Sequence, residues 1–292
     1  MFFERAKPLL IIDSHSILHS LRFTGRKYYT GGEEYTLTQS FFMAIEKLAE
    51  TLYSDRIVFA WDSPVNKRKQ EFSFYKSGRE PKDQSDIDKQ YDNLCFKQFR
   101  LLRDNILPYI GFPCYMVEGY EADDIIASIV MNNKTSMIFV TTDADMYQLL
   151  PYARMYDYRH KQIYTDEWFE SSCGFSASEW WKVKAYAGCA SDTVPGIPGI
   201  GEKTAIAYLN GKLLPKHKKY KDISNGEYAD IIRRNERIVR LPYEGCPAIT
   251  IPKIETAPSF SKFHQIVAYY SLWNYKKEDK LAAIRKTLNM GE

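Results

Sequence analysis

Three short apolar runs in this 292-residue chain each lead to an aspartate, and this pattern constrains the fold more than any other feature. The runs are residues 9–12, 56–61 and 137–142, and they lead to Asp13, Asp62 and Asp143. Each has the length and apolar character of a buried strand, and helical patterns at 38–53 and 87–106 separate them. Strands that alternate with helices predict an α/β fold with a mostly parallel central sheet and flanking helices.

The acids that end these runs are expected to lie together, because ligands of parallel α/β sheets bind at the carboxyl ends of the strands. A fourth group of acids, Glu121, Asp123 and Asp124, begins a helical stretch in the segment EGYEADDIIASIV at 118–130. One acid in a first helical turn is stabilised by about 0.3–1 kcal/mol, but three within one turn repel one another. The arrangement therefore indicates a positively charged ligand at this edge of the sheet.

The donor chemistry suggests which ion this is. Clustered carboxylates without histidine or cysteine are hard oxygen ligands, which suit Mg²⁺ or Mn²⁺ rather than zinc. Two such ions about 4 Å apart can activate a water and stabilise an in-line displacement at phosphorus. The five histidines show no metal-binding spacing. The sequence therefore predicts a centre that binds two divalent ions and acts on phosphate esters.

Cysteine usage and hydropathy bear on where the chain acts. The five cysteines are an odd number, are widely spaced and form no C-x-x-C, which excludes a simple disulfide framework and a cysteine-based zinc site. This usage is typical of a reducing compartment. The early apolar run at 9–12 is too short for a signal peptide or a membrane span. We therefore expect a cytoplasmic protein that makes no membrane contact.

Basic segments flank the acids, although the net charge is only +3. Residues 64–82 hold six basic and two acidic residues, and residues 211–240 hold nine basic and four acidic residues. Charge runs of this kind are usually solvated faces. Beside an acidic metal pocket, they indicate a polyanion whose backbone lies along the basic surface while one phosphate meets the metals.

A glycine-rich stretch, VPGIPGIGEKTAIAYL at 194–209, offers a second phosphate-binding feature. A P-loop is excluded, because Glu202 stands between Gly201 and Lys203 and no apolar strand precedes the stretch. A turn over 195–201 followed by a helix from Glu202 fits better. Amides of such a turn at a helix N-terminus can bind phosphate.

Five segments, in order along the chain, resemble the 5′-nuclease family. This family comprises the flap endonuclease and 5′→3′ exonuclease domain of bacterial DNA polymerase I and free-standing phage 5′-exonucleases. The matching segments are LLIIDSHSILH, VFAWDSPVNKRKQEFSFYKSGRE, GYEADDIIAS, TTDADMYQLL and GCASDTVPGIPGIGEKTA. The resemblance covers nearly the whole chain, and five motifs in the correct order are far more specific than any one alone.

The resemblance implies a set of metal ligands. Asp13, Asp62, Glu121 and Asp123 would bind the first ion, with Asp124 close by and also assigned to the metal set. Asp143, Asp145 and Asp192 would hold the second ion. The expected ions are Mg²⁺ or Mn²⁺, two per site.

The resemblance also implies how DNA would be held. Lys76 and Arg79 would contact the scissile phosphate and have catalytic roles, and Arg68 would also contact DNA. A helical arch over about 76–110 would pass a single-stranded 5′ end. A helix-hairpin-helix over about 194–210 would hold the duplex, with K⁺ bound there in relatives. Its DNA-binding residues would be Gly199, Gly201, Lys203 and Thr204.

The domain organisation expected from these patterns has two parts. Residues 1–172 would form the α/β nuclease core with the metal site and the arch, and residues 173–292 a helical DNA-binding region with the hairpin. The expected activity is metal-dependent 5′→3′ exonuclease and 5′-flap endonuclease cleavage of DNA in replication or repair. RNA primers or RNA–DNA hybrids are further expected substrates, and the chain is expected to be a monomer.

One departure from the family pattern leaves alternatives open. Where the family reads G-D-x-x-D-N, this chain has Cys189 in place of the first Asp and Thr193 in place of the Asn. A structure-specific DNA-binding protein with weakened or lost catalysis is therefore one alternative. A second is a phosphatase of the haloacid dehalogenase type, since FVTTDADM imitates its D-x-D motif. That fold would need neither the hairpin nor the basic segments, which weighs against it.

Overall fold

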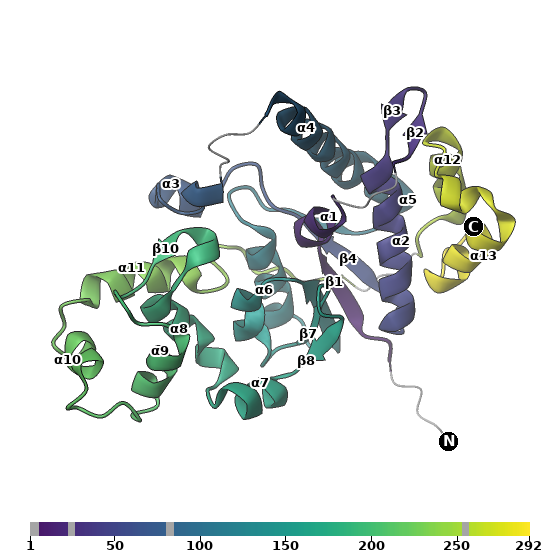
Figure 1. Cartoon of the computed structure of the whole chain (residues 1–292). Coiled ribbons are helices and arrows are strands. Elements are labelled where there is room, and N and C mark those ends of the chain that lie inside the picture. Colours follow the sequence, from purple (N-terminus) through teal and green to yellow (C-terminus); the bar gives the residue numbers. More distant parts are fainter. Residues whose placement is uncertain (1–5, 23–26, 80–84, 253–256) are drawn as a thin grey trace, which may run out of the picture.

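The computed structural model describes residues 6–22, 27–79, 85–252 and 257–292. Its centre is a six-stranded sheet in the order β5-β4-β1-β6-β7-β8 (Figure 1). All neighbouring strands pair in parallel except β7 and β8. The strands are β5 (Cys114–Tyr115), β4 (Ile57–Ala60), β1 (Leu9–Asp13), β6 (Met137–Thr141), β7 (Arg154–Asp157) and β8 (Gln162–Tyr164). The prediction of a mostly parallel α/β sheet is confirmed.

The three apolar runs predicted as strands are β1, β4 and β6, and they form the middle of the sheet. Every residue of these strands is buried, as expected for parallel strands covered on both faces. Side chains alternate between the faces: Leu10 and Ile12 of β1 pack into one hydrophobic cluster, while Leu9 and Ile11 pack into another. Two separate cores therefore lie on the two sides of one sheet.

The first core lies between the sheet and a group of helices from both ends of the chain. Its members include buried residues of the long helix that follows β3 and of the helix pair at the C-terminus. The elements on this side are α1 (Ser14–Leu21), α2 (Thr36–Thr51), α4 (Asp86–Leu101), the π-helical turn η2 (Leu102–Ile106), α5 (Leu107–Ile110), α12 (Phe260–Tyr269), η6 (Trp273–Lys276) and α13 (Glu278–Thr287). A short hairpin, β2 (Tyr29–Thr30) with β3 (Glu33–Glu34), precedes α2.

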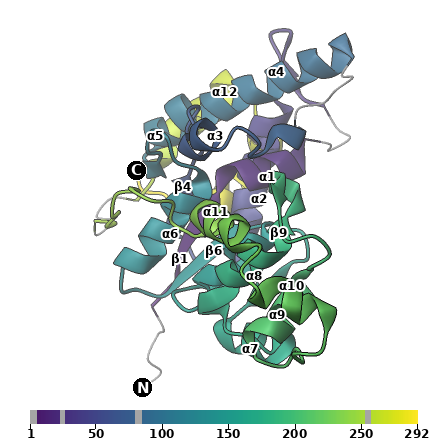
Figure 2. The ribbon, with the colours of Figure 1, turned by 90° about the vertical axis from the view of Figure 1, so that its left-hand side faces the viewer.

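The second core is covered by helices from the middle of the sequence. Figure 2 shows this side of the molecule, with α6, α8 and α11 in front of the sheet. The elements here are α6 (Ala122–Asn132), η3 (Ala144–Leu149), α7 (Asp166–Cys173), η4 (Ala177–Glu179), α8 (Trp180–Ala187), α9 (Glu202–Leu209), α10 (Lys218–Ser224) and α11 (Ala229–Val239). The helix predicted to start at Glu202 is α9, and Gly201 is its N-cap.

The C-terminal helices differ from the expected domain organisation. Residues 173–292 were expected to form one helical region, but Phe263, Tyr275 and Ile284 are buried in the first core with α2 and β1. Leu241, Tyr243 and Ile249, which precede these helices, are instead buried in the second core, on the opposite side of the sheet. Burial of apolar side chains against α2 and α5 therefore joins the last helices to the N-terminal part.

The region between β4 and β5 contains short helices before the long α4. The helix α3 (Lys67–Glu71) and the 3₁₀ turn η1 (Ser77–Arg79) precede it. The predicted arch spans about 76–110, and its residues 80–84 lie outside the described residues. In the described ranges, no helix combines the length and the hydropathy needed to cross a bilayer.

Candidate active site

The carboxyl end of β1 supplies the first acid of the site. Asp13 is the last residue of β1 and the N-cap of α1, and its side chain accepts a hydrogen bond from the Ser16 N–H at 3.0 Å. The Thr141 hydroxyl at the end of β6 donates to its other oxygen at 2.7 Å. Only 5% of Asp13 is exposed. Two neighbouring strand ends therefore fix this carboxylate.

The end of β4 is tied directly to the start of α6. Asp62 accepts a hydrogen bond from the Ala122 N–H at 2.6 Å, and Ala122 is the first residue of α6. Glu121 is the N-cap of this helix, and Asp123 lies in its first turn. The acids that the sequence places after β4 and before α6 are therefore brought together by a helix-capping arrangement.

The end of β6 supplies the third acid. Asp143 is the N-cap of η3, and its side chain accepts from the Asp145 N–H at 2.8 Å. Asp145 in turn lies beside the short sheet of β9 (Gly188–Cys189) and β10 (Val194–Pro195). Ligand atoms of Asp145, Cys189 and Asp192 all lie within 4.8 Å of one another. Among the described residues, no other three acids, histidines or cysteines approach so closely.

These acids line one cleft and an adjoining pocket. The cleft has a volume of about 760 Å³, and its lining includes the acids Asp13, Asp62, Asp123 and Asp143. The pocket behind it is lined by Asp123 and Asp143 again, together with Glu121, Asp145 and Asp192. Seven of the eight predicted metal ligands therefore surround a continuous acidic space.

The two basic residues predicted to have catalytic roles, Lys76 and Arg79, also lie in this acidic space. The Lys76 ammonium forms an ion pair with Glu121, and the Lys76 N–H donates to the Asp192 carbonyl at 2.7 Å. Arg79 forms an ion pair with the Asp192 carboxylate at 2.5 Å. Lys76 and Arg79 both line the cleft. Burial lowers the pKa of Lys76, but the carboxylates of Glu121 and Asp192 raise this pKa by more, so that it lies above its usual value. This lysine therefore stays charged.

A third basic residue of the site, Lys184, was not identified from the sequence. Lys184 on α8 is 7% exposed, and its ammonium contacts both Asp145 and Glu202 at 2.7 Å. It therefore connects the acidic pocket to the first turn of α9. The only sequence signal was a lysine four residues after Trp180, on the side of α8 that a helical repeat turns toward the core.

Two sequence predictions need correction. Arg68 was expected to contact DNA, but its side chain is only 4% exposed and is paired with Asp124. Asp124 was assigned to the metal set, but its side chain is fully buried and both of its oxygens accept from Arg68, at 2.6 and 2.7 Å. The carboxylate of Asp124 is absent from the lining of the cleft and the pocket. These two residues neutralise each other in the interior.

The predicted duplex-binding residues lie elsewhere, at the start of α9 (Figures 1 and 2). Gly199 has a φ of +71°, and a Cβ there would meet the Lys219 ammonium at 2.2 Å. The left-handed backbone conformation therefore favours glycine at this position, whereas the Lys219 ammonium is the end of a flexible side chain that can move aside. Lys203 is exposed, and Thr204 is partly exposed in the same turn.

Burial, together with repulsion between neighbouring carboxylates, raises the pKa values of three of these acids in the metal-free protein. Burial and the nearby carboxylate of Asp62 raise the pKa of Asp13 to about 7. Burial and Asp145 raise the pKa of Asp143 to about 6. Burial and Asp143 raise the pKa of Asp123 well above its usual value. Buried carboxylates that repel one another are the donor set that a hard divalent cation stabilises, so the residues fit such an ion.

This electrostatic arrangement predicts a pH-dependent response to Mg²⁺. Asp13 and Asp143 hold protons in the folded chain at pH values where the unfolded chain has released them. The free energy of unfolding of the metal-free protein should therefore fall as the pH rises from about 4 to about 7. Because a bound divalent ion would replace those protons, Mg²⁺ should raise the melting temperature by about 5 °C or more near pH 8 and by less near pH 5.5. Thermal melts in Mg²⁺ and in EDTA check this, and equal shifts at the two pH values would contradict it.

The comparisons with known proteins agree with this geometry. Residues 8–174 match the family described as 5′–3′ exonuclease, N-terminal resolvase-like domain. DNA polymerase I of Thermus thermophilus is 27% identical over 212 residues, which are 71% of this chain and 24% of that protein. A 5′–3′ exonuclease of Halalkalibacterium halodurans is 28% identical over 233 residues, which are 72% of this chain and 74% of that protein. The chain thus spans about a quarter of the polymerase and most of the free-standing exonuclease.

A solved structure matches over nearly the whole chain. The flap endonuclease of bacteriophage T5, in a complex with DNA and metal ions, has a TM-score of 0.67 at 17% identity. The match covers 97% of this chain and 100% of that one. At this level of identity the likeness concerns the fold, and it extends beyond the residues that the family description covers.

Proposed function

We propose that this chain, which belongs to the 5′–3′ exonuclease family, is a divalent-metal-dependent 5′-nuclease that hydrolyses phosphodiesters of DNA. The observation that carries the proposal is the acidic cleft, in which carboxylates from the ends of β1, β4 and β6 face Lys76 and Arg79. Acids alone would repel a polyanion. Acids beside two fixed cations suit a phosphate that is bound together with metal ions.

The residues divide into two groups that would each hold one Mg²⁺ or Mn²⁺. Asp13, Asp62, Glu121 and Asp123 form the first group, and Asp143, Asp145 and Asp192 the second. When bound, the ions supply the charge that activates a water and stabilises the leaving oxygen. The chain itself holds Asp13 and Asp143 in place through helix caps, and the Thr141 hydroxyl also donates to Asp13.

Lys76 and Arg79 would bind the scissile phosphate. Their present partners, Glu121 and Asp192, belong to the two ligand groups. When Glu121 and Asp192 bind metal ions, they would release Lys76 and Arg79. The two basic side chains would then donate to phosphate oxygens. Charge developing on those oxygens in the transition state would be stabilised by both side chains.

The basic surface would hold the rest of the substrate. The turn before α9 and the residues Gly199, Gly201, Lys203 and Thr204 would bind the duplex backbone as part of a helix-hairpin-helix, with a K⁺ ion. A 5′ single-stranded end or flap would pass the segment 76–110 to reach the cleft. We extend the proposal to RNA–DNA hybrids and to a monomer that acts in the cytoplasm.

A flap substrate tests the proposed function. A duplex with a 5′ single-stranded flap, labelled at its 5′ end, is incubated with the protein in Mg²⁺, in Mn²⁺ and in EDTA. Metal-dependent release of a short labelled oligonucleotide is expected for the flap endonuclease, and release of mononucleotides for the exonuclease. Flap binding without any product in either metal would overturn the proposal. The same flap made with a 5′ RNA segment tests the hybrid substrate.

Cys189 gives specific support to the alternative of weakened catalysis. Burial and the Asp145 carboxylate raise the pKa of its thiol to about 12, and the thiol donates to Asp145 at 2.8 Å. A neutral thiol is a poor ligand for Mg²⁺. The second ion would therefore be held by fewer oxygens than the family pattern provides.

Replacing this thiol by a carboxylate is expected to strengthen the second site. Cys189→Asp should lower the Mg²⁺ concentration needed for half-maximal cleavage by about ten-fold and narrow the difference between Mn²⁺ and Mg²⁺. It should also lower the melting temperature in EDTA, because a further buried acid joins Asp145 and Asp192. Cys189→Ser is the matched control, since it changes the size little and adds no charge. Identical Mg²⁺ dependence in the two variants would show that position 189 does not face an ion.

A further inference from the structure

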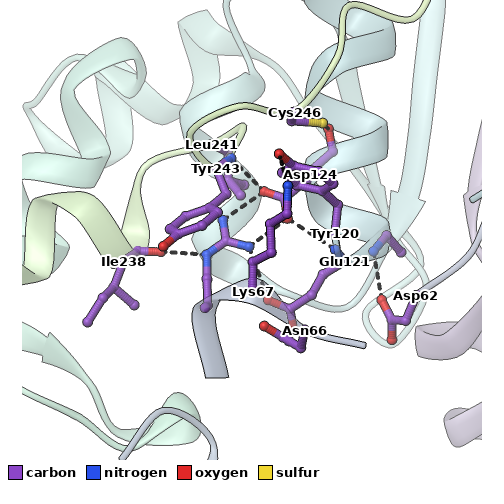
Figure 3. Close-up of polar contacts among 12 residues, drawn as sticks. Asp62, Asn66, Lys67, Tyr120, Glu121, Asp124, Ile238, Leu241, Tyr243 and Cys246 are labelled. Atoms are coloured by element: carbon purple, nitrogen blue, oxygen red, sulfur yellow. Dashed lines mark hydrogen bonds and ion pairs between the residues drawn. The ribbon is translucent and has the colours of Figure 1, made fainter. Parts of the chain in front are cut away.

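A buried ion pair between Arg68 and Asp124 borders the acidic pocket, which Arg68 helps to line. Figure 3 shows the polar contacts around Asp124. The Arg68 guanidinium from α3 and the Asp124 carboxylate from α6 form two parallel hydrogen bonds of 2.6 and 2.7 Å. Arg68 is 3% exposed and Asp124 is fully buried. A buried ion pair is not by itself a source of stability, because desolvation of the charges offsets their attraction. Its remaining contacts therefore indicate its role.

The remaining donor atoms of Arg68 join three segments. Its Nη1 also donates to Glu121 Oε2 at 3.1 Å, and its Nε donates to the Ile238 carbonyl on α11 at 2.9 Å. The ring of Tyr243, in the loop after α11, stacks on the guanidinium at 4.6 Å. Asp124 completes the arrangement by accepting from the Tyr243 N–H at 2.7 Å. The helix α3, the start of α6 and the end of α11 thus meet at one pair of charges.

Glu121 is the carboxylate of this network that lines the acidic pocket, beside Arg68. Its Oε2 accepts from Arg68 and from the Tyr75 hydroxyl at 2.9 Å, whereas its Oε1 contacts the Lys76 ammonium. The backbone N–H of Glu121 donates to Asp124 at 3.1 Å. One oxygen of Glu121 is therefore held from behind, and the other is turned toward Lys76.

We propose that Arg68 and Asp124 are positioning residues that fix which Glu121 oxygen faces the cleft. Asp124 lines neither the cleft nor the pocket, and Arg68 lines only the pocket. We assign neither residue a contact with substrate or with an ion. Asp124 neutralises Arg68 and orients its guanidinium group. The guanidinium donates to Glu121 Oε2, and the Ile238 carbonyl and the Tyr243 ring hold the guanidinium in place. The packing of α11 is in this way connected to the geometry of a proposed metal ligand. This inference rests on the proposed function of the cleft.

The test uses a double variant without either charge to distinguish an effect on the position of Glu121 from an effect on protein stability. Arg68→Met leaves Asp124 buried without its partner and should lower the melting temperature strongly. Arg68→Met combined with Asp124→Asn removes both charges and keeps an oxygen that can accept from the Tyr243 N–H, so the melting temperature should recover. Mn²⁺ affinity measured without DNA, and turnover on the flap substrate, should both stay about 10- to 100-fold below the unaltered chain. If Mn²⁺ affinity and turnover recover in the double variant together with the melting temperature, the proposal is overturned.

A conservative variant decides the case if the double variant does not regain stability. Arg68→Lys keeps the charge but cannot hold both Asp124 oxygens and Glu121 together. Its Mn²⁺ affinity should fall by a similar factor, and unchanged affinity and turnover in this variant would overturn the proposal. Glu50→Gln is the matched control, because Glu50 pairs with Lys47 on the exposed side of α2 and has no contact with Arg68, Asp124 or Glu121. The control should retain full Mn²⁺ affinity. An unaltered chain that binds Mn²⁺ but cuts no flap would instead refute the proposed function.

Discussion

Asp145→Asn is expected to lower the turnover of flap DNA by at least about 1,000-fold while leaving flap affinity nearly unchanged. The Asp145 carboxylate lies close to Cys189 and Asp192, and the backbone N–H of Asp145 donates to the Asp143 side chain. Because an amide is a weaker ligand than a carboxylate, the second ion would lose about 4 kcal/mol of its effect on the transition state. Asp145 contacts Lys184 but is assigned no contact with phosphate, so the affinity for DNA should remain.

Single-turnover cleavage and equilibrium binding of the same labelled flap measure the two effects separately. Asp279→Asn, an exposed acid on α13, is the matched control and should cut like the unaltered chain. If Asp145→Asn cuts at the unaltered rate, the assignment of the second metal group is wrong.

Lys76→Ala should reduce turnover by about 100- to 1,000-fold, with a smaller loss of affinity. The Lys76 ammonium enters the cleft beside Glu121, and its backbone, with a φ of 57°, is anchored by the N–H bond to the Asp192 carbonyl. Alanine keeps that backbone bond, so the variant removes the charge and leaves the turn in place. The lost charge would have stabilised the developing charge on the phosphate in the transition state.

The matched control for this prediction is Lys47→Ala on α2, whose side chain is 76% exposed. The turnover number and the dissociation constant of flap DNA are compared for both variants. A turnover number unchanged in Lys76→Ala would remove this lysine from the chemistry. A loss confined to affinity would make it a binding residue only.

The sequence predicts the sheet and its acidic edge because both depend on local patterns. The run at 9–12 is apolar along its length, so both faces must be covered. Parallel pairing then brings Asp13, Asp62 and Asp143 to one edge of the sheet. The start of α6 follows from capping rules in the same way. These features need only the order of elements along the chain.

The misassigned residues depend on contacts between distant segments. Arg68 looks like one of several basic residues in 64–82, and only the folded chain brings it to Asp124 and to the carbonyl of Ile238, which lies 170 positions away. Lys184 becomes a site residue only because α8 packs beside η3 and α9. Periodicity does not show which buried charge will find which partner.

The position of the C-terminal helices escaped prediction for a related reason. An amphipathic helix such as α12 needs an apolar surface, but its pattern does not show which of two available surfaces it covers. Burial of Phe263 against α2 answers this question in the structure, where the two rings of Phe42 and Phe263 lie 5.2 Å apart.

The central claim, that this chain holds two divalent ions in its acidic cleft, is tested most directly by anomalous diffraction from crystals grown with Mn²⁺ and a 5′-flap DNA. The account predicts two Mn²⁺ peaks, one beside Asp13, Asp62 and Asp123 and one beside Asp143, Asp145 and Asp192. It also predicts that the Asp124 carboxylate remains on Arg68 and contacts neither ion. A cleft without ions, or an ion bound by Asp124, would contradict the account.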